Sequence, residues 1–363
     1  MKVNLSKILL ALGATVYLVS CTTIDKPINK ETAPSITSPT LEIPTQTLPK
    51  QKEATKDPAT VADLPVLTDT PRSVIETIEA PSENEIVDAP LVETPIIEKP
   101  SLVPTPNPVI SLCQEIGSKL GSVSITDCLN QQLTHSSYSA ENRSLAFKDF
   151  PPLPGRTPLG RILVIGGIHG DEFSSVSMIF RWMGKLDQFH SGMFHWRFVP
   201  SSNPDGLLKR KSQRQNVNGV DLNRNFPTAD WENQALSFWV KDSLKNPRRY
   251  PGPTSASEPE TKWLVNQIKA FKPDVIISMH APYHLVGYDG PPKAPDNLGS
   301  LYLRKLGVFP GSLGNYAGVD LNMPIVTVEL QSAGIMPSTD EIDQMWRDLI
   351  RWLRGQLSTA QSD

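Results

Sequence analysis

The segment from residue 22 to residue 110 limits how much of this 363-residue chain can form a packed core. It holds 15 prolines and contains no glycine, cysteine or aromatic residue. Such a composition cannot bury enough apolar surface to offset the entropy that ordering removes. We therefore expect a disordered N-terminal tether and a core built from later residues. Docking of a partner onto this proline-rich segment is the alternative interpretation.

The first 20 residues have the pattern of an export signal. Lys2 and Lys7 precede the apolar run "ILLALGATVYLVS" and give the segment a positive start. The run is too short for a comfortable membrane span. The last residues of this run, together with Cys21, read "LVSC", which resembles the lipobox of bacterial lipoproteins. We expect a lipid on Cys21 that anchors the chain in the cell envelope, facing the periplasm, with the outer membrane preferred. An ordinary signal peptide with a chance cysteine is the other interpretation.

Only two further cysteines occur, Cys113 and Cys128. Disulfides persist outside the cytoplasm, so an exported chain is expected to join them. A loop of this size is stabilised by about 3 kcal/mol in the chain-entropy description. Two separate buried thiols are the alternative. The net charge of −3 provides no basic field for nucleic acid, which excludes that class of partner.

From residue 161 onward, predicted strands and helices alternate, which favours an α/β sheet. The expected strands are four short apolar runs: "RILVIGG" (161–167), "FHWRFVP" (194–200), "DVIISMH" (274–280) and "PIVTVEL" (324–330). A helix with its apolar stripe at Val176, Ile179, Phe180 and Met183 follows the first strand. Two later helices are expected to open with capping boxes, Ser257 with Glu260 and Ser338 with Glu341.

Polar side chains occur where three of these strands end. His169 and Glu172 lie in the turn "GGIHGDEFSS", His280 closes "DVIISMH", and Glu329 lies in "TVEL". Ligand sites of open α/β sheets lie beyond the carboxyl ends of the strands. Two imidazoles and one carboxylate suit a catalytic zinc ion with an open position. The nitrogen-rich ligand set favours zinc over other divalent ions, at one ion per chain.

The stretch "NPDGLLKRKSQRQNVNGVDLNRNFP" (203–227) resembles the signature of the M14 zinc carboxypeptidases, and most closely their murein peptide amidase A branch. The resemblance covers about residues 155–355. It implies a three-layer α/β/α fold with a mixed, mostly parallel sheet. The domain organisation that we expect is a signal peptide (1–20), a tether (21–110), a small leader (111–155), a peptidase domain (156–356) and a flexible tail (357–363).

The resemblance also assigns roles. It implies that His169, Glu172 and His280 hold zinc. Asp221 then hydrogen-bonds His169 and orients it. Glu329 is the general base that takes a proton from the attacking water.

Three further residues of the motif handle charge on the substrate. Arg214 is expected to stabilise the oxyanion, while Asn223 and Arg224 hold the free carboxylate of a peptide terminus, which suits the planar fork of arginine. The "PGSLGN" segment resembles a loop that shapes the pocket for the released residue, so Ser312 and Asn315 are expected substrate contacts. Tight-turn roles for this loop are the alternative. We find no counterpart of the mobile-loop tyrosine of digestive carboxypeptidases.

The expected function is therefore a monomeric zinc metallopeptidase that cleaves an amide bond next to a C-terminal carboxylate. By the resemblance, the bond joins γ-D-glutamate to meso-diaminopimelate in murein peptides. A carboxypeptidase for α-linked peptides and an aspartoacylase-like amidohydrolase are the enzyme alternatives, although "NRNFP" favours peptidases. A lipid-tethered peptidoglycan-binding module without catalysis is the non-enzyme alternative, which the presence of Glu329 disfavours.

Overall fold

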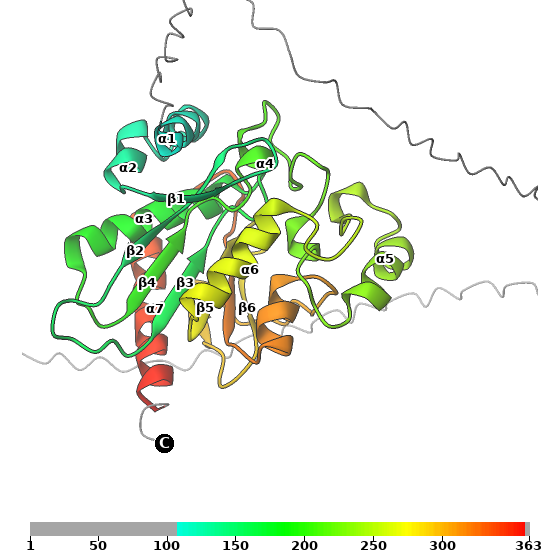
Figure 1. The fold of residues 1–363 in the computed structure, drawn as a ribbon. Helices are drawn as coiled ribbons and strands as arrows, with labels where there is room; N and C mark the ends of the chain where they lie inside the picture. Colours follow the sequence, from blue (N-terminus) through cyan, green and yellow to red (C-terminus); the bar gives the residue numbers. More distant parts are fainter. Residues whose placement is uncertain (1–106, 360–363) are drawn as a thin grey trace, which may run out of the picture. The chain divides into compact units, whose positions relative to one another are not determined.

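The computed structural model describes residues 107–359 (Figure 1). The predicted signal peptide, the lipidation site Cys21 and nearly all of the predicted tether lie outside these residues, as do residues 360–363 of the tail. Among residues 107–359, no helix has both the length and the apolar character that crossing a membrane requires.

A seven-stranded mixed sheet forms the centre of the fold, in the order β1-β2-β4-β3-β5-β9-β6. Its four parallel strands are the four that the sequence predicts. Their order places the strands "RILVIGG", "DVIISMH" and "PIVTVEL" side by side, so the polar residues that follow or close them lie at one edge of the sheet. These strands are β4 (His195–Val199), β3 (Arg161–Ile165), β5 (Val275–His280) and β9 (Ile325–Glu329). The antiparallel strands are β1 (Thr134–Tyr138), β2 (Ser144–Phe150) and β6 (Leu285–Asp289), and a separate ribbon pairs β7 (Asn297–Leu298) with β8 (Leu301–Tyr302).

Helices cover both faces of this sheet, so the predicted three-layer α/β/α fold is confirmed (Figure 1). Helices α3 (Phe173–Phe189) and α7 (Thr339–Thr359) pack on one face, and α6 (Pro259–Phe271) and the π-helical turn η3 (Asn315–Asp320) pack on the other. The remaining helices are α1 (Pro108–Lys119), α2 (Ile125–Asn130), α4 (Pro204–Leu208), α5 (Trp231–Lys241), η1 (Leu222–Arg224) and η2 (Pro247–Arg249).

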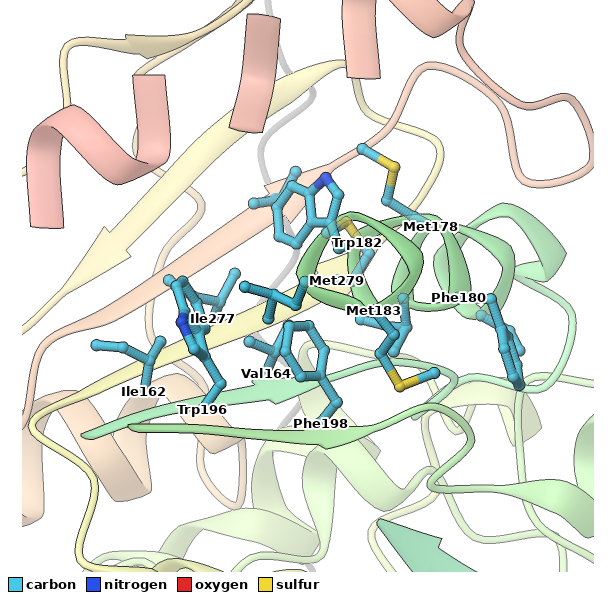
Figure 2. Close-up of a cluster of buried hydrophobic side chains, with 14 of the residues drawn as sticks. Ile162, Val164, Met178, Phe180, Trp182, Met183, Trp196, Phe198, Ile277 and Met279 are labelled. Atoms are coloured by element: carbon cyan, nitrogen blue, oxygen red, sulfur yellow. The ribbon is translucent and has the colours of Figure 1, made fainter. Parts of the chain in front are cut away.

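The core follows from the two-residue alternation of the strands. Figure 2 shows Trp182 and Met183 of α3 against Trp196, Phe198 and other side chains of the central strands. The intervening strand residues point to the α6 face. Each fully buried side chain of this size contributes about 1.5–3 kcal/mol. The core therefore fixes the strand ends, and with them the polar residues that follow.

Part of the predicted leader segment joins the main sheet, which the sequence does not indicate. Strand β2 pairs antiparallel with β4, and the side chain of Asn107 caps α1 by accepting from the backbone N–H of Val109. A disulfide joins Cys113 of α1 to Cys128 of α2, with their Cα atoms 5.3 Å apart. The sequence did not indicate β1 because its five residues, "THSSY", are polar or half-exposed.

One predicted capping box forms and the other does not. Ser338 and Glu341 exchange the expected hydrogen bonds at the start of α7. The predicted box of Ser257 with Glu260 is wrong, because α6 begins at Pro259 and Ser257 donates instead to Glu258. The Glu260 carboxylate accepts hydrogen bonds from the backbone of Ala140 and from other groups outside α6.

Burial of Glu260 leads to a prediction about stability. Burial raises the pKa of Glu260 from 4.5 to about 7, so the folded protein holds a proton that the unfolded chain has released. Its stabilising contribution is complete below pH 4.5 and is lost as the pH rises through 7. When the pH is lowered from 8 to 5, the melting temperature of the wild type minus that of Glu260→Gln should increase by on the order of 3 °C. The exposed control Glu232→Gln should follow the wild type, and a Glu260→Gln curve parallel to the wild type would contradict the assignment.

Candidate metal centre and carboxylate site

Three side chains converge at the carboxyl end of the parallel strands. His169 and Glu172 lie in the turn between β3 and α3, and His280 is the last residue of β5. Gly170 directly follows His169, and a Cβ atom there would lie 2.2 Å from the carbonyl carbon of Gly206 in α4. The turn therefore packs against α4 at a point where only glycine fits.

The distances within this group fit a shared metal ion. The Nδ1 atoms of His169 and His280 are 3.2 Å apart, and they lie 2.8 Å and 3.1 Å from the two carboxylate oxygens of Glu172. All three residues offer a ligand atom within 4.8 Å of the others, and all are buried. Ligand atoms at about 2.0–2.1 Å from a tetrahedral zinc lie about 3.3 Å from one another, so the three residues fit that ion.

The electrostatics of this group also favour a cation. Burial and the neighbouring charge of Arg214 disfavour the charged form of His169, but Glu172 and Asp221 outweigh both and raise its pKa. Burial likewise acts against the charge of Glu172, yet the two histidines hold its pKa far below the usual range. The buried carboxylates thus stabilise positive charge at the point where the histidine nitrogens meet, which is the charge that a divalent ion would supply.

Two residues of the "RQNVNGVDLNRNFP" motif support this group. Asp221 places Oδ1 3.2 Å from Nε2 of His169, as expected for an orienting carboxylate. Its Oδ2 accepts from Nε of Arg214 at 2.9 Å, and Nη1 of Arg214 lies 3.7 Å from Oε1 of Glu172. Arg214 thus lies against the ligand group, with its guanidinium fixed by a fully buried carboxylate.

Glu329 lies beside this group on the neighbouring strand. It pairs in register with His280 across β9 and β5 and is 6% exposed. Its Oε2 accepts a long hydrogen bond of 3.4 Å from the backbone N–H of Tyr283. Burial raises the pKa of its carboxyl group. A second carboxylate is therefore held next to the ligands without being one of them.

Arg224 is a buried cation that forms no ion pair within residues 107–359. Its Nε has no hydrogen-bond partner there, and its guanidinium stacks 4.4 Å from the ring centre of Phe309. Burial lowers its pKa to about 10. Asn223 beside it accepts from the backbone N–H of Leu313 through Oδ1, at 2.8 Å. An unpaired buried charge of this kind is costly, so this arrangement suits an incoming carboxylate.

The two predicted contacts in "PGSLGN" make bonds within the fold. Ser312 Oγ accepts from the backbone N–H of Asn315, and Nδ2 of Asn315 donates to Asp230. Their contact with a substrate stays a prediction. His284, which a spacing of four residues from His280 could suggest as a ligand, lies instead in a left-handed backbone conformation on an exposed loop.

Sequence reasoning missed Asp289, at the end of β6. A Cβ atom on Gly314 would lie 2.5 Å from Oδ2 of Asp289, so this carboxylate lies against the "PGSLGN" segment. Burial raises its pKa, and no hydrogen bond or ion pair within the described residues reaches it. No local pattern in the sequence could have found it, because its place depends on the antiparallel pairing of β6 with β9.

Two histidines and a glutamate that converge at strand ends, with a buried carboxylate beside them, are the features of a hydrolytic metalloenzyme. The chain belongs to the zinc carboxypeptidase family, whose sequence model matches residues 132–301. That family uses zinc, and His169, Glu172 and His280 are the described residues that could hold it.

Named relatives agree with this assignment. Murein peptide amidase A of Escherichia coli K12 is 30% identical over 199 residues, which cover 52% of this chain and 79% of that protein. The protein of the same name from Vibrio campbellii is 27% identical over 226 residues, 55% of this chain and 87% of its own. The carboxypeptidase A structure from Helicoverpa armigera has the same fold, with a TM-score of 0.50 and 14% identity over 69% of this chain and 80% of its own.

Proposed function

We propose that this zinc metallopeptidase releases a C-terminal residue from murein peptides by cleaving the bond between γ-D-glutamate and meso-diaminopimelate. The observation that carries the proposal is Arg224, a buried guanidinium that lacks an anionic partner among residues 107–359. It suits the free carboxylate of the residue to be released. Relatives that share 27–30% identity are named murein peptide amidases, which supports this substrate class.

The residues of the chain divide the chemistry among them. Bound zinc supplies polarisation of the scissile carbonyl and lowers the pKa of water. Glu329 takes a proton from the attacking water and delivers it to the nitrogen of the leaving amine. Arg214 donates to the oxygen that becomes negative at the scissile carbon, and Asp221 keeps its guanidinium in place.

Asp289 supports diaminopimelate as the released residue. Val326, Val328 and Val286 point to the α7 face, so Thr327, Glu329 and Asp289 point to the opposite face. Thr327 is the only partly exposed residue of the central strand β9, which shows that solvent reaches the sheet beside Glu329. Asp289 lies on the neighbouring strand β6, where it pairs with Ile325. It is therefore two residues further along the sheet from Glu329 than Thr327 is. A carboxylate there can accept a charge-assisted hydrogen bond from the ammonium group of the diaminopimelate side chain.

The test is hydrolysis of L-Ala-γ-D-Glu-meso-diaminopimelate by the purified zinc-loaded chain, with the released amino acid identified by mass spectrometry. We expect diaminopimelate release, which a chelator stops. A hippuryl-type substrate with an ordinary α-linkage serves as the comparison. Faster hydrolysis of that substrate than of the tripeptide would replace the proposal with the α-linked carboxypeptidase alternative.

The role of Asp289 can be separated from the rest of the site. Asp289→Asn should lower kcat/KM on the tripeptide by about 10-fold to 100-fold, the value of one charge-assisted hydrogen bond. On an analogue that ends in 2-aminopimelate, which lacks the distal amine, the same variant should match the wild type. An equal loss of kcat/KM on both substrates would show that Asp289 does not bind the distal ammonium group.

A further inference from the structure

Helix α4 connects the metal ligands to Arg214. Its backbone at Gly206 abuts Gly170, between the two ligands of the turn. The carbonyl of the same Gly206 accepts from the backbone N–H of Gln213 at 3.0 Å, next to Arg214. Asn203, which caps α4, donates from Nδ2 to the backbone carbonyl of Arg214 at 3.1 Å. A displacement of α4 therefore moves both Arg214 and the ligand turn.

Asp205 of α4 is held entirely by the leader segment. Its side chain is fully buried, and it accepts from Ser139 Oγ at 2.7 Å, from the backbone N–H of Glu141 at 2.9 Å and from Nη1 of Arg143 at 2.9 Å. All three donors lie in the turn between β1 and β2. A buried carboxylate requires paired charge, and Arg143 is its cation.

Arg143 is in turn fixed to the disulfide-linked helices. Its Nε donates to Glu115 of α1 at 3.0 Å. Lys119, the last residue of α1, donates to the backbone carbonyls of Lys209 and Arg210 at 2.8 Å and 3.2 Å, just beyond α4. Helices α1 and α2 precede residue 132, where the match to the family begins, so these contacts to α1 involve a part of the chain outside the matched region.

We propose that Arg143 is a positioning residue that links α1 to Asp205 and thereby holds α4, the Arg214 guanidinium and the His169–Glu172 turn in their working arrangement. The inference rests on the proposed hydrolysis only for its assay substrate. It concerns stabilisation of the transition state, so it acts on kcat and leaves substrate affinity unchanged.

The test is a double-mutant cycle between Arg143 and Arg214 in the full chain, with the tripeptide as substrate. Arg143→Ala should lower kcat by about 10-fold to 100-fold, with KM unchanged within about 2-fold. In an Arg214→Ala background, the same change should lower kcat by a clearly smaller factor than in the wild type, because the guanidinium that it positions is gone and only its effect through the His169–Glu172 turn remains. Arg143→Lys should recover part of kcat, since it keeps the charge beside Asp205.

The matched control is Arg156→Ala, which removes an arginine whose side chain donates, among the residues that the structure describes, to the backbone carbonyl of Ser191 alone. It should leave kcat unchanged. Glu115→Gln is the milder second variant, because it weakens the α1 contact and leaves Asp205 paired. It should lower kcat by about 2-fold to 5-fold without loss of folded protein.

A second readout does not depend on activity. Hydrogen–deuterium exchange of residues 204–216 should rise in Arg143→Ala and Glu115→Gln and stay unchanged in Arg156→Ala. An Arg143→Ala enzyme with wild-type kcat, or a loss that is equally large in both backgrounds, would overturn the proposal. A wild type that is inactive on the tripeptide would instead refute the proposed substrate, and the exchange measurement would still decide the positioning role.

Discussion

Replacing Glu329 with glutamine is expected to lower kcat on the tripeptide by about 10³-fold or more, because the variant cannot take the proton of the attacking water. The side chain keeps its shape and its place opposite His280 in the sheet, so the fold should persist. KM should change little, since the carboxylate acts on the reacting water and not on the substrate terminus. Steady-state kinetics on the zinc-loaded proteins measures both quantities.

The control for this prediction is metal content. Glu329 is not among the three residues that can share an ion, so Glu329→Gln should bind as much zinc as the wild type. The exposed Glu232→Gln should retain full activity. Activity of Glu329→Gln within about 10-fold of the wild type would assign the proton transfer to another group.

Replacing Arg224 with alanine is expected to lower kcat/KM on the tripeptide by about 10²-fold to 10³-fold, the value of a buried charge pair with a substrate carboxylate. The sharper measurement compares the tripeptide with its C-terminal amide. The wild type should prefer the free acid by a factor of that order, whereas Arg224→Ala should hydrolyse both at similar rates. Arg224→Lys should recover only part of the preference, because an ammonium cannot form the two parallel hydrogen bonds of a guanidinium.

Arg249 provides the matched control for Arg224. It is an exposed cation whose charge acts on Arg224, so it shares the local field but not the burial. Arg249→Ala should keep the preference for the free acid. If Arg249→Ala loses the preference as fully as Arg224→Ala does, the recognition is diffuse electrostatic attraction and not a bound carboxylate.

The parallel strands could be predicted because each is a short apolar run bounded by polar or turn residues. Strand β5, for example, is buried along its whole length, and such strands read as continuous apolar segments. The edge strands were missed for the converse reason. Strand β1 is half-exposed, and β6 contains Gly287 and ends in Asp289. Neither strand therefore shows a regular alternation of apolar and polar residues.

The site was predictable as far as its residues follow local patterns. His280 and Glu329 each end a strand, whereas His169 and Glu172 lie in the turn after β3. The sheet order brings these positions together. Asp289 was not predictable, because its place depends on β6 pairing antiparallel with β9. The Ser257 box failed because Pro259 sets the start of α6 and the Glu260 carboxylate finds donors in other segments. Long-range partners of this kind leave no trace in local spacing.

Zinc stoichiometry in the ligand variants tests the central claim most directly, namely that His169, Glu172 and His280 bind one ion together. Inductively coupled plasma mass spectrometry of the purified chain should find one zinc per wild-type molecule. It should find almost none in His280→Ala, provided that circular dichroism shows a folded protein. A wild type without zinc, or a His280→Ala protein that retains it fully, would contradict the account.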